Sequence, residues 1–356
     1  MSSIAPGATI GILGGGQLGR MIAVAAAQLG YRTHIYAPET SGPAADVSPR
    51  WTRGAYTDSE ALAGFAGTVD LITYEFENIP EATVDQLAAL GHVRPNARAL
   101  GIAQDRLTEK RFVADLGGRT APFEPVASLD DLEEAIERIG SEAILKTNRF
   151  GYDGKGQARL SDPGDAVGAW NLVGRQPSIL EGFVRFGSEF SVILARGADG
   201  EVRFWDSPLN VHEQGILATS TVPGGDSVAA QVDEARALAR KVADALDYVG
   251  VLTLEFFASA DGPVFNEMAP RVHNSGHWTI EGSVTSQFEN HVRAICGLPL
   301  GDTALAARQA VMRNLIGHDA DEWEAILADP ANHLHLYGKR EARPGRKMGH
   351  VTRLTL

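Results

Sequence analysis

The 356-residue sequence contains a single cysteine, Cys296, and this scarcity limits the chemistry open to the chain. One cysteine cannot form a disulfide within the chain or supply the thiolate cluster of a zinc site. The residues around it follow an apolar helical pattern, so we expect a buried structural thiol.

Long apolar stretches and an excess of positive charge are also missing. No segment approaches 18 uncharged apolar residues, and the N-terminus lacks the charged and then apolar regions of a secretory signal. The 32 Lys and Arg residues face 45 Asp and Glu, which gives a formal net charge of −13. This net charge argues against a nucleic-acid surface, which would need an extended basic face, although a local cluster can still hold a small anion. We expect a cytoplasmic protein that binds neither membranes nor nucleic acid.

The composition, 44% hydrophobic and 22% charged residues, is typical of a globular protein, and the length predicts two or three domains. Strands and helices alternate over residues 1–97, which predicts an α/β domain with a parallel sheet. Residues 98–300 read as α+β with two mostly antiparallel sheets, and residues 301–356 as a tail of short strands. Single helices are expected over residues 97–116 and 226–246.

A glycine-rich segment at residues 14–19 (GGGQLG) follows the first predicted strand and opens a helix. It matches G-x-G-x-x-G formally, and Glu39 lies near the position of a ribose-binding acid, so NAD binding is one reading. By itself the motif indicates only that an anion could approach a helix N-terminus. Glu75 lies at the C-terminal end of a later parallel strand, on the edge where such sheets bind ligands; a solvated carboxylate is the alternative.

Two alternating runs, residues 251–257 and 263–268, predict a β-hairpin. If Phe257 pairs with Pro263, then Glu255 and Glu267 project from one face with Cα atoms roughly 7–8 Å apart. A loop with an even number of residues would place them on opposite faces. Two converging carboxylates favour Mg²⁺, which prefers carboxylate oxygens together with substrate phosphates. One solvated and one salt-bridged Glu is the alternative, but the polar segment that follows favours a site.

Residues 150–157 (FGYDGKGQ) predict a phosphate-binding lid between two strands. Gly151, Gly154 and Gly156 would leave backbone N–H groups accessible to a phosphate, and Lys146 and Lys155 supply positive charge. A plain hairpin is the alternative. Near the C-terminus, a basic cluster surrounds Pro344 and Gly345. This turn is suited to binding one phosphate, and a solvated basic surface is the alternative. The cluster comprises Lys339, Arg340, Arg343, Arg346 and Lys347.

Five strings together resemble the bacterial 5-(carboxyamino)imidazole ribonucleotide synthetase family of ATP-grasp enzymes. They are GGGQLGRM (14–21), DRLTEK (105–110), GYDGKGQ (151–157), NEMAPRVHNSGHWT (266–279) and RPGRKMGH (343–350). The resemblance implies a Rossmann-like pre-ATP-grasp domain, a central two-sheet ATP-grasp domain and a small C-terminal β-rich, barrel-sandwich-like domain. Family members usually continue beyond the position of Leu356, which implies a smaller or truncated tail domain.

The resemblance implies a carbon–nitrogen ligase of purine biosynthesis that uses ATP, Mg²⁺ and bicarbonate. It would carboxylate the exocyclic amine of 5-aminoimidazole ribonucleotide through carboxyphosphate, with release of ADP and phosphate. A homodimer and transfer of the product to a carboxyaminoimidazole ribonucleotide mutase are also implied.

The family's functional positions fall on specific residues of this sequence. The implied ATP contacts are Arg106, Lys146, Gly151, Tyr152, Asp153, Gly154, Lys155, Gly156, Gln157, Glu181, Gly182, Phe183, Val184, Glu189, His212, Asn266 and Glu267. The implied metal ligands are Glu255 and Glu267. The implied ribonucleotide contacts are Gln17, Leu18, Glu75, Tyr152 and Asp153, with the phosphate on Arg340, Arg346 and Lys347. Bicarbonate would lie on Arg271, His273 and Asn274, and the implied catalytic set is these three with Asp153 and Lys347. Ala269 stands where many ATP-grasp enzymes carry Asn, which leaves one metal ligand unassigned.

Three other functions compete with this one. An NAD(P)-dependent oxidoreductase would explain residues 14–19 but not the paired acids or the predicted lid. A formate-dependent glycinamide ribonucleotide transformylase would share the ATP-grasp features, and an inactive nucleotide sensor would bind ATP without turnover.

Overall fold

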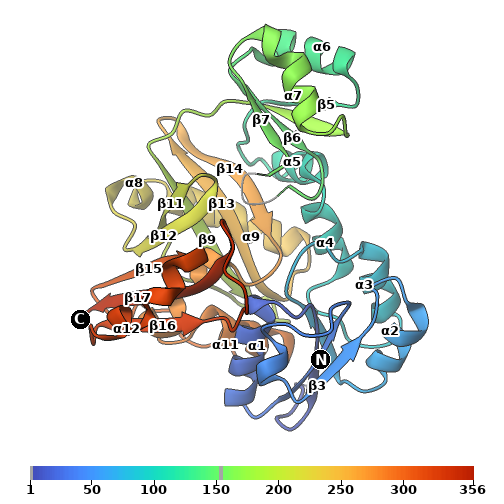
Figure 1. Ribbon diagram of the computed structural model, residues 1–356, viewed down its shortest axis with the longest axis vertical. Coiled ribbons are helices and arrows are strands. Elements are labelled where there is room, and N and C mark those ends of the chain that lie inside the picture. The colour runs from blue at the N-terminus through green and yellow to red at the C-terminus, as the bar shows by residue number, and fades with distance from the viewer. Residues whose placement is uncertain (1–2, 152–154) are drawn as a thin grey trace.

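The computed structural model describes residues 3–151 and 155–356. Within these residues the strands form three sheets, which Figure 1 shows as a blue N-terminal unit, a green unit at one end and a central body that runs into the red C-terminal strands. No helix in these two ranges combines the length and the apolar character needed to cross a bilayer.

The first sheet is parallel, with strand order β3-β2-β1-β4, as the alternation of strands and helices predicts. Its elements are β1 (Thr9–Leu13), α1 (Gln17–Gln28), β2 (Arg32–Ala37), η1 (Ala45–Val47), β3 (Arg50–Arg53), α2 (Ser59–Ala66), β4 (Leu71–Tyr74) and α3 (Glu81–Ala88). Strand β3 and helix α2 were not predicted; β3 carries two arginines and no continuous apolar run.

The second sheet is antiparallel, has the order β5-β8-β6-β7, and is packed against two helices. Its elements are β5 (Phe123–Val126), α6 (Leu129–Ile139), β6 (Ala143–Thr147), β7 (Gln157–Leu160), η2 (Pro163–Asp165), α7 (Ala166–Leu172) and β8 (Ser178–Gly182). Ser128 caps α6 by accepting from the Asp131 N–H, as its position before two acids predicts. In Figure 1 this green unit projects beyond the rest of the molecule.

The third sheet is the largest and continues into the C-terminal strands, because β15 pairs with β12. Its strands are β9 (Ser188–Arg196), β10 (Val202–Phe204), β11 (Leu209–Glu213), β12 (Ile216–Val222), β13 (Gly250–Ser259), β14 (Gly262–Ala269), β15 (Gln309–Ile316), β16 (Asn332–Leu336) and β17 (Lys347–Thr355). The short strands predicted within residues 301–356 are present as β15, β16 and β17, and they extend the central sheet.

The remaining helices connect or cover these sheets. They are α4 (Ala97–Ala103), α5 (Arg106–Asp115), α8 (Asp226–Ala229), α9 (Val232–Ala245), η3 (Asn274–Gly276), α10 (Thr279–Gly282), α11 (Gln287–Ile295), η4 (Gly317–Glu322) and α12 (Trp323–Leu327). Both long predicted helices are broken. The first is divided into α4 and α5, and α5 starts after Asp105, whose carboxylate accepts a hydrogen bond from the Thr108 N–H as an N-cap. The second is divided into α8 and α9 by residues 230 and 231.

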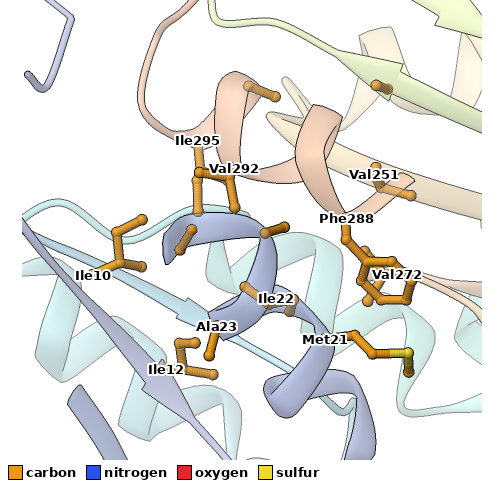
Figure 2. Packing of buried hydrophobic residues seen from close by; sticks show 14 of the residues in the cluster. Ile10, Ile12, Met21, Ile22, Ala23, Val251, Val272, Phe288, Val292 and Ile295 are labelled. Carbon is orange, nitrogen blue, oxygen red and sulfur yellow. The ribbon is translucent and has the colours of Figure 1, made fainter. Parts of the chain in front are cut away.

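The core joins the N-terminal unit to the central body, since helices α1 and α11 pack side by side (Figure 2). Met21, Ile22 and Ala23 of α1 belong to one buried cluster with Phe288 and Val292 of α11. Cys296 is part of this cluster and is fully buried, as its apolar surroundings predict. Burial raises the pKa of its thiol to about 11, so the thiol stays protonated at neutral pH.

Candidate active site

The two predicted metal-binding acids lie directly opposite each other on neighbouring strands. Glu255 of β13 pairs with Glu267 of β14, and a register shift lies between Glu255 and Phe256. The predicted Phe257–Pro263 pairing is wrong, because Pro263 pairs with Ala258 and the turn contains two residues. That even-numbered turn would have separated the acids. The extra residue Asn266 forms a bulge that returns Glu267 to the face of Glu255.

The ionisation of this pair reflects crowding of negative charge. Burial, and then the neighbouring Glu267 carboxylate, raise the pKa of Glu255 to about 7. Burial acts against the ionised form of Glu267 as well, but the Arg106 guanidinium 2.9 Å away holds the pKa of Glu267 below its usual range. His273 Nε2 lies 3.2 Å from Glu255. Because the pKa of Glu255 is raised beside Glu267, a divalent cation between the two acids would favour the ionised form of Glu255.

A magnesium ion fits these residues. Mg²⁺ needs only one or two protein carboxylates when substrate phosphates complete its shell. Over residues 3–151 and 155–356, no group of three His, Cys, Asp or Glu side chains forms a complete protein-only site. The buried Asn266 Oδ1, next to Glu267 in sequence, has no hydrogen-bond partner within the described part of the chain. An additional ligand at this bulge would satisfy that oxygen.

A cavity of about 390 Å³ gathers many of the predicted site residues from all three parts of the chain. The predicted residues that line it are Gln17, Leu18, Glu75, Arg106, Gly151, Glu255, Glu267, Arg271, His273, Asn274 and Lys347. The cavity wall thus combines the end of the parallel sheet, the acid pair and the first residue of β17. The polar segment after β14 contributes Arg271, His273 and Asn274 to this wall.

Glu75 explains what the glycine-rich segment at the start of α1 does. Its carboxylate accepts hydrogen bonds from the backbone N–H groups of Gly16 and Gly19, the latter at 2.7 Å. A Cβ on Gly16 would approach a Glu75 oxygen to 2.5 Å, so a larger residue there would displace the carboxylate from this position. The protein's own carboxylate therefore occupies the anion site of this helix N-terminus. This arrangement disfavours binding of a dinucleotide at residues 14–19.

Arg271 is held by an acid that the sequence analysis did not select. Its guanidinium forms an ion pair with Glu77, which also lines the cavity. Although burial acts against the ionised form of Glu77, Arg271 holds the pKa of Glu77 below its usual range. Glu77 belongs to the polar run after β4. Its position at the sheet edge where ligands bind could have identified it as a site residue.

A buried charge cluster lies on the predicted nucleotide side of the site. The Glu181 carboxylate is 3.1 Å from Lys146 Nζ and 3.3 Å from Lys110 Nζ. Burial opposes its ionisation, yet the two ammonium groups lower the pKa of Glu181 to about 2. Two lysines share one acid, which leaves a net positive charge for an anionic ligand. Lys110 was missed because its helical pattern resembles that of a surface charge.

Glu109 is another acid in the cavity wall that the sequence did not indicate. Its Oε1 accepts from the Met268 N–H at 2.7 Å. Burial, and then the Glu267 carboxylate, raise the pKa of Glu109 to about 8. The raised pKa favours the protonated form of Glu109, which would reduce the negative charge beside Glu267.

Glu189 and His212, both predicted nucleotide contacts, lie side by side, with His212 Nδ1 2.9 Å from the Glu189 carboxylate. His212 belongs to β11. A register shift between Val211 and His212 interrupts the strand pairing and conceals the alternation in the sequence. Burial lowers the pKa of His212, but the neighbouring carboxylates of Glu189, Glu255 and Glu267 together outweigh burial, and the pKa is raised overall.

The predicted lid is a β6–β7 connection, and part of it lies in the described residues. Arg106 Nη2 donates to the Gly151 carbonyl at 3.1 Å, and the Thr147 N–H donates to the Gly156 carbonyl at 2.8 Å. Gly156 has a φ of +69°, which favours glycine. Lys155 and Gln157 flank this position. The predicted contacts Tyr152, Asp153 and Gly154 lie outside the described residues.

The segment predicted to bind adenine already uses two of its backbone donors. The Gly182 N–H donates to the Pro122 carbonyl, and the Phe183 N–H donates to the Glu142 carbonyl. Any backbone contact to a base must therefore use other groups, such as those of Val184. Arg159 lies over the Phe183 ring at 4.5 Å from its centroid.

The basic cluster near the C-terminus contributes unequally to the cavity. Lys347 lines it, whereas Arg340 and Arg346 are absent from the described lining residues. Arg346 Nη1 instead donates to the Glu341 carbonyl at 3.0 Å, and Arg340 is exposed. The structure thus does not bring the three predicted phosphate ligands together at this cavity.

Comparisons with known proteins agree with the geometry. Residues 111–288 match the ATP-grasp domain, residues 7–104 the ribonucleotide synthetase preATP-grasp domain, and residues 310–355 the phosphoribosylaminoimidazole carboxylase C-terminal domain. The chain is 52% identical over 356 residues to N5-carboxyaminoimidazole ribonucleotide synthase of Brucella melitensis biotype 1, with 99% of this chain and 98% of that protein covered.

Solved structures show the same fold. The N5-carboxyaminoimidazole synthetase of Staphylococcus aureus complexed with ADP has a TM-score of 0.95 at 36% identity, covering 100% of this chain and 95% of that one. The synthase of Aspergillus clavatus in complex with ADP and 5-aminoimidazole ribonucleotide has a TM-score of 0.91 at 30% identity, covering 98% and 94%. The fold class and the resemblance predicted from the sequence are confirmed. The chain belongs to the N5-carboxyaminoimidazole ribonucleotide synthase family of ATP-grasp ligases.

Proposed function

We propose that this enzyme carboxylates the exocyclic amine of 5-aminoimidazole ribonucleotide, using ATP and bicarbonate and releasing ADP and phosphate. The observation that carries the proposal is the cavity that unites the facing acids Glu255 and Glu267 with the Arg271–Asn274 segment and Lys347. The bound ADP and ribonucleotide of the Aspergillus clavatus relative support the same pair of ligands.

The nucleotide side of the site would be formed by the charged groups beside the second sheet. Arg106, Lys146 and the described lid residues Gly151 and Lys155 would contact the phosphates. Glu181 pairs with both Lys110 and Lys146, and these ion pairs would keep the two lysine side chains in position. Val184 would contribute to the adenine pocket, Glu189 with His212 would hold the ribose, and Asn266 would contact the nucleotide.

Glu255 and Glu267 would hold Mg²⁺ against the terminal phosphates of ATP. When bound, the ion neutralises charge on the transferring phosphoryl group, which is the main electrostatic demand of this chemistry. Arg106 lies beside this metal site, because its guanidinium pairs with Glu267. Its guanidinium can turn from the carboxylate to a phosphate once the cation compensates Glu267.

The remaining cavity residues would bind bicarbonate and the ribonucleotide. Arg271, His273 and Asn274 would orient bicarbonate toward the γ-phosphoryl group, and Gln17, Leu18 and Lys347 would contact the ribonucleotide. Glu75 would contribute indirectly, by fixing the start of α1. Bicarbonate is a poor electrophile, and its phosphorylation produces carboxyphosphate, which the amine attacks. Because carboxyphosphate hydrolyses quickly, the cavity must exclude water during turnover.

We further propose that the enzyme acts in the cytoplasm as a homodimer and passes its product to a carboxyaminoimidazole ribonucleotide mutase. An N-carboxylated amine loses CO₂ readily, so an enzyme that consumes it must follow. Sedimentation at several protein concentrations tests the dimer, since a single species of monomer mass contradicts it.

Phosphate release tests the proposed reaction. Purified enzyme with Mg²⁺, ATP, bicarbonate and 5-aminoimidazole ribonucleotide should release phosphate, and omission of ATP, of bicarbonate or of the ribonucleotide should each abolish full turnover. Replacement of bicarbonate by formate and of the ribonucleotide by glycinamide ribonucleotide is the matched comparison. Full turnover with that pair and none with the first would overturn the proposal.

A further inference from the structure

Asn314 is a polar residue on the buried face of a strand in the C-terminal part of the chain. It belongs to β15 and shares a face with the core residues Ala310 and Met312. Only 3% of its surface is exposed. A buried amide is costly unless its donors and its acceptor are hydrogen-bonded, so the partners of Asn314 indicate what it does there.

One donor of Asn314 continues the pairing of β15 with β12. Arg313 and Thr219 form the last backbone pair of this register. At the next residue the side chain takes over, because Asn314 Nδ2 donates to the Leu217 carbonyl of β12 at 2.7 Å. A carbonyl oxygen can only accept a hydrogen bond, so the nitrogen of the Asn314 amide must face β12. This contact fixes which of the two amide positions is nitrogen and which is oxygen.

The rest of the Asn314 amide pairs with the amide of Asn274, a predicted bicarbonate ligand in the cavity wall. Asn314 Nδ2 donates to Asn274 Oδ1 at 2.8 Å, and Asn274 Nδ2 donates to Asn314 Oδ1 at 3.0 Å. Each N–H of Asn314 is then used once, one on Leu217 and one on Asn274. Rotation of the Asn274 amide by half a turn would bring oxygen against oxygen and nitrogen against nitrogen. The pair therefore holds this amide in one orientation.

That orientation decides what Asn274 offers to a ligand. The pair uses one of its two N–H groups, and within the portion of the chain that the structure describes no other hydrogen bond engages its amide. One N–H therefore remains for an acceptor in the cavity. An oxygen of the bicarbonate anion is such an acceptor. Exchange of the amide nitrogen and oxygen would present an oxygen in place of this donor, and that oxygen would repel the anion.

We propose that Asn314 is a positioning residue that holds the Asn274 amide with its remaining N–H available to bicarbonate. Strand β15 thereby takes part in a site whose other proposed bicarbonate contacts, Arg271 and His273, follow β14. The proposal rests on the function proposed above and deepens it. If Asn314 served only to tie β15 to Leu217, its loss would have the same effect whether or not Asn274 is present.

Steady-state kinetics of a double-mutant cycle test this assignment. Asn314→Ala frees the Asn274 amide to rotate, so kcat/KM for bicarbonate should fall by about tenfold or more, because misplaced substrate-binding groups are costly. The KM for ATP should stay within about twofold of the wild-type value. In an Asn274→Ala background no amide remains to be oriented, so Asn314→Ala should cost less than about twofold there. Equal fold losses in the two backgrounds would overturn the proposal.

Asn290→Ala is the matched control. Asn290 is a buried asparagine of α11 that exchanges two hydrogen bonds with the Gly301 backbone, at 2.7 and 3.2 Å, and it is not among the described residues that line the cavity. Its loss should lower thermal stability about as much as the loss of Asn314 but leave kcat/KM for bicarbonate unchanged. An equal fall of kcat/KM in both variants would contradict a specific role of Asn314. If Asn314→Ala does not fold, Asn314→Leu, which has a similar volume and no polar side-chain atom, takes its place in the cycle.

NMR of asparagine-labelled enzyme tests the same contact without turnover. The side-chain amide signal of Asn274, assigned by its loss in Asn274→Ala, should shift when bicarbonate is added in the presence of Mg²⁺ and ADP. In Asn314→Ala the same shift should need about tenfold more bicarbonate. A wild-type signal that bicarbonate does not shift, or an unchanged titration in Asn314→Ala, would refute the proposal even in a fully active enzyme. The predicted weakening in an enzyme that lacks the carboxylation activity would instead refute the proposed function alone.

Discussion

At the scale of single residues, the site consists of opposite charges that hold one another until ligands arrive. Arg106 pairs with Glu267, Arg271 pairs with Glu77, and Glu181 pairs with two lysines. These pairs fix long side chains in position, which reduces the ordering required when ATP binds. A charged ligand that binds here must replace one member of an existing ion pair. The effect of a charge-removing substitution on binding therefore depends on which charged side chain loses its partner.

Glu267→Gln tests the metal-binding role of the acid pair. The amide keeps an acceptor for Arg106 but loses the charge that holds the cation, so ADP formation should fall by about 100-fold or more. Kinetics and a thermal unfolding curve should show lost turnover with an intact fold. The exposed Glu324→Gln is the control and should behave as wild type. Unchanged turnover in Glu267→Gln would remove Glu267 from the metal site.

Glu181→Gln tests the buried charge cluster through pH. The two lysines lower the pKa of Glu181 from 4.5 to about 2 in the folded protein. Its stabilisation is therefore present above about pH 4.5 and is lost as pH falls towards 2. It amounts to on the order of 3 kcal/mol, since one pKa unit corresponds to about 1.4 kcal/mol. Urea unfolding at pH 7 should show a less stable variant, and the difference should narrow below pH 4.5. A difference that stays constant with pH would contradict this interpretation.

At the scale of elements, local irregularities place the functional side chains. The bulge at Asn266 brings Glu267 opposite Glu255, and the break between α4 and α5 puts Arg106 at the first position of a helix. The sequence predicted the hairpin, the common face of the acids and the glycine-rich connection. It did not predict the register, because a bulge leaves no mark in an alternating pattern. It also merged α4 and α5, because periodicity continues across a cap.

Asp105→Ala tests whether the cap of α5 positions Arg106. Loss of the hydrogen bond to the Thr108 N–H should destabilise the protein by about 1 kcal/mol. Ser128→Ala removes the equivalent cap of α6, away from the cavity, and should cost about the same. The two variants should differ in kinetics, because the KM for ATP should rise several-fold for Asp105→Ala only. Equal KM values would show that the cap is purely structural.

At the scale of the whole molecule, the cavity exists because three parts of the chain meet. Helix α1 of the N-terminal unit contributes Gln17, the acid pair comes from the central sheet, and β17 contributes Lys347. Packing of α1 on α11 joins the first two parts, and β15 beside β12 joins the third (Figure 1). Sequence patterns located the three parts but not their mutual orientation, which depends on contacts between residues far apart in the chain. For this reason the sequence could not show which residues of the basic cluster line the cavity and which lie outside it.

Lys347→Ala and Arg346→Ala test this distinction in the basic cluster. Because Lys347 lines the cavity, its loss should raise the KM for the ribonucleotide about tenfold, the equivalent of about 1.4 kcal/mol. Arg346, which donates to the Glu341 carbonyl, should matter less than about threefold when replaced. Initial rates at varied ribonucleotide and saturating ATP give both values. A larger effect of Arg346→Ala would place the substrate phosphate outside this cavity.

The fate of a bicarbonate oxygen tests the central claim most directly. If the enzyme phosphorylates bicarbonate, turnover with ¹⁸O-labelled bicarbonate transfers one labelled oxygen into the released phosphate. Phosphorus NMR detects this oxygen as an isotope shift of the phosphate signal. We predict that each phosphate formed in the presence of 5-aminoimidazole ribonucleotide carries one ¹⁸O from bicarbonate. Unlabelled phosphate alongside a carboxylated product would contradict the account, because the carboxyl group would then have been transferred without carboxyphosphate.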